Sequence, residues 1–175
     1  SNKSVTPNKS RKLFFTNIIN QYFPLDKNIT ICELGAGGGL FQLTLKEFGY
    51  KNSFGLDTSK EQVALAKIQN IDVRELNIYE FIEASIKERR KYDVIIAIDV
   101  FEHFAKDDLF DLINKLNIVL NNDGMVVSHQ PNAQSPFFGN IRYGDFTHHN
   151  AFTNSSISQV FLANNFLSVD SYEDK

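Results

Sequence analysis

The sequence predicts an α/β fold, a mostly parallel, twisted sheet with helices on both faces, and three observations carry that prediction. Short apolar runs alternate with segments of helical periodicity along the chain of 175 residues. The first run, residues 29–34, leads directly into a glycine-rich turn and the start of a helix. Residues 94–98 are apolar throughout, which is typical of a strand buried on both faces of a parallel sheet.

The expected elements of the first half follow in order. Residues 13–23 have apolar side chains at helical spacing and stop at Pro24. Residues 29–34 form the first strand, and residues 40–48 form a helix that Gly49 ends. Residues 53–56 are a short strand that reaches Asp57, and Ser59 then caps a helix that runs to about residue 70.

The second half repeats this alternation. Residues 71–76 are the third strand, residues 79–89 a helix and residues 94–98 the fourth strand. Residues 107–120 form an amphipathic helix, Asp123 and Gly124 a turn, and residues 125–128 the fifth strand. A long loop, 130–153, precedes a helix that Asn154 or Ser155 caps, and residues 167–169 form a last strand. Strands alternating with helices imply right-handed crossovers and a parallel sheet.

The length of 175 residues indicates a single domain over residues 1–175. We expect residues 1–9 to be flexible and loop 130–153 to contact the substrate. A net charge of -3 gives no general attraction to nucleic acid or to an anionic membrane. No apolar stretch approaches the roughly 20 residues that cross a bilayer, and no signal peptide is visible, so we expect a cytoplasmic protein. The single cysteine, Cys32, excludes disulfides and is expected to be a buried, inert thiol.

The turn after the first strand indicates a nucleoside-containing cofactor. Its glycines, Gly35, Gly37 and Gly39, have the spacing G-x-G-x-G, and Leu40 stands where a dinucleotide-binding turn needs glycine. The Glu33 carboxylate disfavours a pyrophosphate at this helix N-terminus and suits a ligand with an amino group and a sulfonium, which is S-adenosylmethionine. Asp57, at the tip of the next strand, suits the two hydroxyls of a ribose.

From residue 29 to about 130 the chain resembles the class I S-adenosylmethionine-dependent methyltransferases. Residues 33–39 match the first family motif, residues 55–59 the second, residues 92–103 the fourth strand and residues 123–127 the turn into the fifth. The resemblance implies a Rossmann-like sheet and a set of cofactor-binding residues, which are Glu33, Gly35, Ala36, Gly37, Gly39, Asp57, Thr58, Asn77, Ile78 and Asp99.

The same resemblance implies seven strands, the seventh antiparallel beside the sixth. This chain stops at Lys175, shortly after the candidate sixth strand, so the seventh strand is expected to be missing. An unpaired sheet edge of this kind would favour a homodimer. The first helix, 11–23, would either close over the cofactor or pack on the edge of the sheet.

Asp99, Glu102 and His103 are spaced to share one face of a helical turn and are candidate ligands of magnesium or manganese. Their run, Asp-x-x-Glu-His, resembles the Glu-x-x-Glu-His stretch of the ubiquinone-biosynthesis O-methyltransferases, which are metal-assisted. In the alternative interpretation, Asp99 faces the cofactor while Glu102 and His103 brace the loop.

The long loop resembles one in bacterial methyltransferases that act on sugars of capsules, O-antigens and related glycans. The resemblance implies a small-molecule sugar acceptor, with Asn132, Arg142 and Tyr143 as substrate contacts. Arg142 would hold a phosphate, and Asp145 would pair with His148 as acid and base. Without a metal the base would be His148 or His129, whereas with a metal His129 would become a further ligand. In the alternative, Asp145 merely caps a turn.

Three functions therefore remain open. The first is a sugar O-methyltransferase of bacterial surface polysaccharide synthesis. The second is a small-molecule O- or N-methyltransferase of another pathway, such as quinone synthesis, and the third is a cofactor-binding module without activity. A nucleic acid substrate is disfavoured because the chain has no basic stripe and no motif for holding a flipped base.

Overall fold

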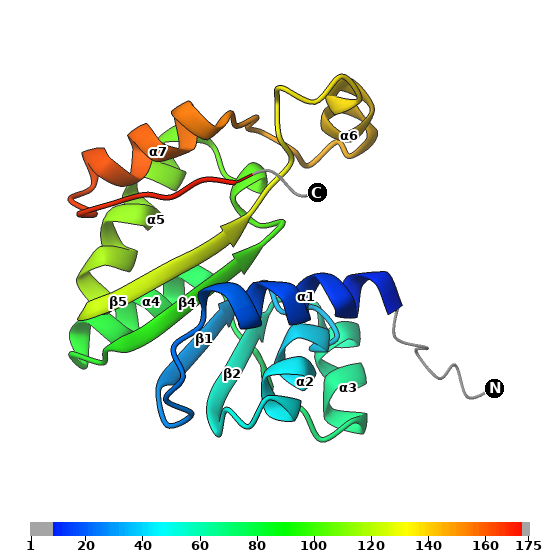
Figure 1. Ribbon diagram of the computed structural model, residues 1–175, viewed down its shortest axis with the longest axis vertical. Coiled ribbons are helices and arrows are strands. Elements are labelled where there is room, and N and C mark those ends of the chain that lie inside the picture. The colour runs from blue at the N-terminus through cyan, green and yellow to red at the C-terminus, as the bar shows by residue number, and fades with distance from the viewer. Residues whose placement is uncertain (1–8, 173–175) are drawn as a thin grey trace.

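The computed structural model describes residues 9–172, and its fold is the expected α/β sheet with helices on both faces (Figure 1). Over these residues five parallel strands pair in the order β3-β2-β1-β4-β5. The strands are β1 (Thr30–Leu34), β2 (Asn52–Asp57), β3 (Val73–Glu75), β4 (Tyr92–Ile98) and β5 (Leu120–His129). The helices are α1 (Lys9–Tyr22), α2 (Leu40–Glu47), α3 (Lys60–Ile68), α4 (Ile78–Lys87), α5 (Lys106–Val119), α6 (Phe138–Gly144) and α7 (Asn154–Ala163), with a 3-10 turn, η1 (Phe101–His103).

The helices form two layers, with α1, α2 and α3 on one face of the sheet and α4, α5 and α7 on the other (Figure 1). Successive residues of β4 enter different apolar cores. Ile96 packs with the cluster that holds Phe41 of α2, whereas Ile95 packs with the cluster that holds Leu112 of α5. Both faces of β4 are therefore buried, as its unbroken apolar sequence predicted.

The order of the strands reverses between β1 and β4. From β1 the chain moves outward through β2 to β3, then crosses back so that β4 pairs with the other edge of β1. Sheets of this kind bind ligands in the crevice at the carboxyl ends of the two strands that flank the reversal. Here that position is occupied by Gly35, directly after β1, and Asp99, directly after β4.

The expected strand at residues 167–169 is absent, and this prediction was wrong. The segment has no strand partner within residues 9–172, and Leu167 is 96% exposed. Phe166 and Val169 instead pack against the core beneath α5 and α7. Their spacing of three residues cannot place both on one face of a strand, where side chains alternate with a period of two.

The expected loop, 130–153, contains a helix that the sequence analysis missed. α6 has no buried residue, so it lacks the apolar stripe by which a helix is recognised in a sequence. It lies beyond the arrowheads of β4 and β5 (Figure 1). The base of the segment is closed by a bridge between Asn132 and Phe152, reinforced by a hydrogen bond of 2.6 Å from the Ala133 N–H to the Phe152 carbonyl.

Several boundaries also differ from expectation. Thr153, rather than Asn154 or Ser155, caps α7 through a reciprocal pair of bonds with Ser156. The expected turn at Asp123 and Gly124 lies inside β5, where residues 121–124 bulge between two paired positions. β3 is shorter than expected and α3 ends at Ile68.

At the N-terminus, the expected flexible segment 1–9 falls on residues 1–8, which lie outside the described residues, and on Lys9, which begins α1. None of the helices in the described part of the chain has the length and apolarity that a membrane span requires.

Candidate cofactor and substrate site

The turn after β1 is built from glycines in the left-handed region of backbone conformation. Gly35, Gly37 and Gly39 have φ values of 67°, 53° and 82°. A side chain at Gly39 would place its Cβ 2.9 Å from Cγ2 of Ile71, so the turn also packs tightly against the segment that leads into β3. Glycine is needed here for both conformation and space.

The Asp57 carboxylate links this turn to the next helix. Its Oδ2 accepts a hydrogen bond of 2.7 Å from the Gly37 N–H, and its Oδ1 accepts one of 2.8 Å from the Ser59 N–H. Ser59 caps α3 as expected, because its hydroxyl accepts from the Gln62 N–H. A carboxylate has about four acceptor positions, so Asp57 retains capacity for further donors.

Glu33 is buried beneath the turn, with only 4% of its surface exposed. Its Oε2 accepts a hydrogen bond of 2.8 Å from Nε2 of Gln42. Burial raises the pKa of the Glu33 carboxyl to about 8, although the Gln42 bond and the positive charge of Arg11 act in the opposite direction. A cation placed beside Glu33 would favour its ionised form, since opposite charges lower the pKa of an acid.

A cavity of about 450 Å³ lies against Glu33 and the glycine turn. Its lining includes Arg11 and Phe15 of α1 and Gln62 and Leu65 of α3. α1 therefore packs on α2, where Phe15 and Phe41 have ring centres 4.6 Å apart, and also borders the cavity.

Asp99 joins three elements at the carboxyl end of β4. Its Oδ1 lies 2.7 Å from Nδ1 of His129, and its Oδ2 accepts a bond of 3.3 Å from Nη2 of Arg11. Burial raises the pKa of Asp99, but the hydrogen bond and charge of His129, together with Arg11, outweigh it, and the net pKa lies below its usual value. Asp99 is therefore an ionised partner of His129.

Glu102, His103 and His148 form a second cluster, in which one potential ligand atom of each residue lies within 4.8 Å of the others. Glu102 is 2% exposed, and within the described residues its Oε2 has no hydrogen-bond partner. Burial raises the pKa of the Glu102 carboxyl to about 6, and the charge of Asp99 adds to this rise. The rings of His103 and His148 meet edge to face at 4.8 Å between centres.

Backbone and side-chain bonds attach the loop after α6 to η1. The Glu102 carbonyl accepts from the N–H groups of His149 and Asn150, at 2.7 and 3.0 Å. Nδ1 of His103 lies 2.9 Å from the Thr147 hydroxyl. These bonds explain how His148, 45 positions further along the chain, comes to lie beside His103.

Asp99 does not belong to this second cluster, although the sequence spacing placed it there. It adopts a left-handed conformation with φ of 56°, and η1 begins only at Phe101. The chain thus turns between Asp99 and Glu102, and the Asp99 carboxylate faces His129 and Arg11 instead. The expectation that Asp99, Glu102 and His103 share one helical face was wrong for this reason.

The loop side chains are only partly brought together. Asp145 accepts from both the N–H and the hydroxyl of Thr147, at 2.8 and 2.6 Å, as a turn cap does. His148 Nε2 is 3.8 Å from Asp145 Oδ2, too far for a hydrogen bond. Arg142 donates to the His149 carbonyl at 3.2 Å, and Tyr143 is 83% exposed.

The remaining expected site residues lie at the start of helices or turns. Asn77 caps α4 by accepting a bond of 2.8 Å from the Tyr79 N–H, and Ile78 is the first residue of that helix. Thr58 is exposed between β2 and α3. The Asn132 side chain accepts from the Gln134 N–H at 2.9 Å.

Two residues at the site were missed by the sequence analysis. The sequence contained a clue to Gln42, because this polar residue interrupts the apolar stripe of α2 between Phe41 and Leu45. In the structure Gln42 is 3% exposed. Arg11 carried none, since a basic residue on an amphipathic helix is most often solvated. Only the path of α1 across the cavity brings Arg11 to Asp99.

Comparison with known proteins agrees with this geometry. A family model described as a methyltransferase domain matches residues 8–170. The crystal structure of a SAM-dependent methyltransferase from Archaeoglobus fulgidus superposes with a TM-score of 0.76 at 20% identity, over 89% of this chain and 69% of that one.

Curated relatives match a shorter part of the chain. The ribosomal protein L11 methyltransferase of Lactobacillus johnsonii is 31% identical over 110 residues, which are 59% of this chain and 31% of that protein. The ubiquinone biosynthesis O-methyltransferase of Pelagibacter ubique is 30% identical over 103 residues, 57% of this chain and 41% of the relative. These matches thus span less than half the length of either relative.

Replacing Gly39 by alanine is expected to destabilise the protein more than replacing Gly49. Both glycines have φ above 80°, so each substitution incurs about 1–2 kcal/mol of backbone strain. Only at Gly39 does the new Cβ meet Ile71, which adds about 1–3 kcal/mol. Urea unfolding of the two variants measures the difference, and equal losses would contradict tight packing of the turn.

Replacing Glu33 by glutamine is expected to raise the free energy of unfolding, increasingly so from pH 6 to pH 9. Because burial raises the pKa of Glu33 to about 8, the folded protein holds a proton that the unfolded chain releases near its usual pKa. The wild type therefore loses stability as pH rises towards and through 8, whereas glutamine does not titrate. Urea unfolding at several pH values measures the free energy of unfolding of both proteins, and Glu80→Gln, at an exposed site, is the control. A gain in the free energy of unfolding that does not depend on pH would contradict the prediction.

Proposed function

The chain belongs to the class I S-adenosylmethionine-dependent methyltransferases, and we propose that it transfers a methyl group to a hydroxyl of a small sugar acceptor, either nucleotide-linked or a glycan precursor. One observation carries the proposal. Asp99 pairs with His129 at 2.7 Å and also bonds to Arg11, which lines a cavity that combines a buried acid with a glycine turn. A donor pocket and a proton acceptor are thus adjacent, which is what methylation of an alcohol requires.

The cofactor would lie across the carboxyl ends of β1 and β2. Asp57 would accept hydrogen bonds from the ribose hydroxyls, and the turn at Gly35, Ala36, Gly37 and Gly39 would face the bound molecule with bare backbone. Glu33 would ionise beside the cationic methionine part. Thr58, Asn77 and Ile78, at the starts of α3 and α4, are on the side where the adenosine would extend.

His129 is the proposed general base, with Asp99 as the residue that orients it. The hydrogen bond between Nδ1 and Asp99 holds the imidazole in a fixed orientation, which suits a general base for the proton of the acceptor hydroxyl. The ionised Asp99 also stabilises the imidazolium that results. His148 and Asp145 fit this role less well, because their 3.8 Å separation leaves His148 without an orienting bond from that acid.

The acceptor would bind under the segment that includes α6. Arg142 is the candidate for a phosphate, while Asn132, Tyr143 and His148 are candidates for sugar contacts. A second candidate is an aromatic acceptor, as in quinone synthesis. It is favoured by the exposed Phe137 and Phe146 beside α6 and by the likeness to the ubiquinone biosynthesis enzyme.

A divalent metal fits the second cluster in part. Glu102 offers a carboxylate oxygen that has no hydrogen-bond partner in the described part of the chain, and His103 and His148 offer imidazole nitrogens. Two imidazoles and one carboxylate suit manganese better than magnesium, which prefers oxygen ligands. Bound there, a metal would lower the pKa of an acceptor hydroxyl. Asp99 would remain outside this set, because Arg11 and His129 engage its oxygens.

Turnover of S-adenosylmethionine on nucleotide-linked sugars is expected to fall about 10²–10⁴-fold in His129→Gln, since a general base contributes about that factor. The exposed Lys87→Gln on α4 should leave it unchanged. Release of S-adenosylhomocysteine is the readout. Turnover of catechols but not of sugars would favour the aromatic acceptor, and absence of cofactor binding would contradict the proposed function itself.

Manganese binding offers a separate test of the second cluster. Protein treated with a chelator and titrated with Mn²⁺ should bind one ion, followed by electron paramagnetic resonance of the free ion. Glu102→Gln should weaken binding about tenfold or more, because it removes the charged ligand. Asp99→Asn should leave Mn²⁺ binding intact, and equal loss in both variants would contradict the ligand set.

A further inference from the structure

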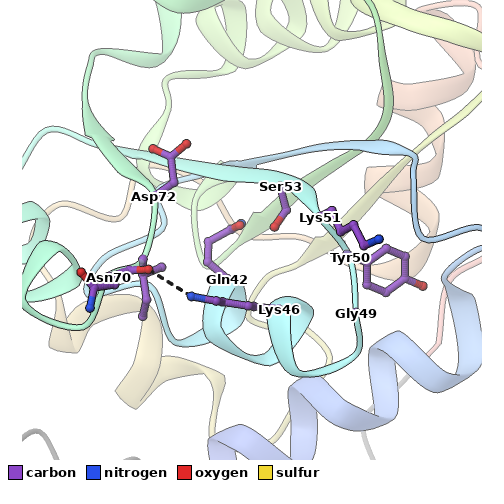
Figure 2. Close-up of a pocket in the computed structure, with 9 residues that line it drawn as sticks. Gln42, Lys46, Gly49, Tyr50, Lys51, Ser53, Asn70 and Asp72 are labelled. Atoms are coloured by element: carbon purple, nitrogen blue, oxygen red, sulfur yellow. Dashed lines mark hydrogen bonds between the residues drawn. The ribbon is translucent and has the colours of Figure 1, made fainter.

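Gln42 is a buried amide on α2, between the buried apolar side chains of Phe41 and Leu45. It borders a second cavity, which lies between the end of α2, the start of β2 and the loop that leads into β3 (Figure 2). Its amide nitrogen, however, bonds to Glu33, which lines the cofactor cavity. Gln42 thus connects the lining of the second cavity to an acid of the proposed cofactor site.

The Gln42 amide has a partner for only one of its two polar atoms. Nε2 donates to Oε2 of Glu33 at 2.8 Å, whereas Oε1 is buried and has no hydrogen-bond partner within residues 9–172. A buried amide oxygen without a donor is unfavourable, so packing alone would favour an apolar residue at this position. The bond to Glu33 is therefore the feature of Gln42 that offsets this cost.

The sheet leaves space for this contact at Gly55. Gly55 of β2 pairs with Glu33 of β1 in the parallel register. A Cβ at Gly55 would collide with Cβ of Ala36, and it would lie 3.5 Å from Cγ of Gln42. The missing side chain thus leaves space beside Glu33, which the turn at Ala36 and the Gln42 side chain fill.

The bond from Gln42 acts on the Glu33 carboxyl in the direction that a cationic ligand requires. Burial raises the pKa of Glu33, and the Gln42 hydrogen bond is the largest influence that lowers it, followed by the charge of Arg11, while the charge of Asp57 adds to the rise. The amide therefore favours the ionised form, which attracts a cation. It also engages Oε2, so Oε1 remains for a donor group in the cofactor cavity.

We propose that Gln42 is a positioning residue, which holds the Glu33 carboxylate so that it receives the amino group of the amino acid part of the cofactor. This inference rests on the proposed function, because it requires S-adenosylmethionine to occupy the cofactor cavity. Gln42 is not among the described residues that line this cavity, so it acts only through Glu33. An acid that a second hydrogen bond already holds in place loses less freedom when the ligand binds, and the affinity is higher.

Isothermal titration with two ligands tests the proposal: S-adenosylhomocysteine has the amino acid part, and 5′-methylthioadenosine lacks it. Gln42→Met removes the amide at similar volume and is expected to weaken binding of S-adenosylhomocysteine about tenfold, as loss of a hydrogen bond to a charged group does. Binding of 5′-methylthioadenosine should be unchanged. Gln159→Met, at an exposed site on α7, is the matched control and should bind both ligands as the wild type does.

A double-mutant cycle and a measurement on the wild type show whether Gln42 acts through Glu33. In the Glu33→Gln background, Gln42→Met should weaken binding of S-adenosylhomocysteine little further, so the two effects should not add. In the wild type, the side-chain amide signal of Gln42 in nuclear magnetic resonance should shift with S-adenosylhomocysteine but not with 5′-methylthioadenosine, because ionisation of Glu33 strengthens the bond. This second readout needs no variant to fold.

Four outcomes would overturn the role of Gln42: unchanged affinity of Gln42→Met for S-adenosylhomocysteine, equal weakening of both ligands, additive effects in the cycle, or an amide signal that does not respond to S-adenosylhomocysteine. Each of them leaves the proposed function standing as long as the wild type binds S-adenosylhomocysteine. A wild type that does not bind S-adenosylhomocysteine would overturn the proposed function together with this inference.

Discussion

The hydrogen bond from the Gly37 N–H to the Asp57 carboxylate holds the two halves of the cofactor site together. It joins the turn after β1 to the tip of β2, and the second oxygen of Asp57 fixes the start of α3. This geometry depends on backbone that bends into the left-handed region at three glycines. A side chain at Gly39 would meet Ile71, so the turn could not keep its packing against the segment that leads into β3.

Charge at this end of the sheet is arranged around two acids with different surroundings. Glu33 is buried, and within residues 9–172 the Gln42 amide is its side-chain hydrogen-bond partner, so burial raises the pKa of Glu33 to about 8. Asp99 is half-buried, and a histidine and an arginine keep its pKa low. One acid is thus set to respond to an incoming cation, and the other is ionised before anything binds. That division suits a pocket for a positively charged donor next to a base.

The sequence was sufficient to predict the parallel sheet, the glycine turn, the place of Asp57 at the tip of β2 and the cap at Ser59, because each depends on local pattern. It was insufficient where position depends on the path of the backbone. Asp99 has a left-handed backbone conformation, which directs its side chain away from Glu102. The spacing of residues in the sequence does not predict such a change in backbone direction. α6 escaped detection because it buries nothing, and residues 167–169 were misread because Phe166 and Val169 reach the core without forming a strand.

The segment 133–152 is attached to the rest of the domain largely through backbone atoms. The Glu102 carbonyl receives the N–H groups of His149 and Asn150, and Ala133 bonds to the Phe152 carbonyl. Main-chain bonds of this kind do not depend on which side chains stand between the anchors. If this segment binds the acceptor, as proposed, residues 134–146 form an exchangeable module, because rewriting them would change acceptor preference without altering these anchors or the bond from Thr147 to His103.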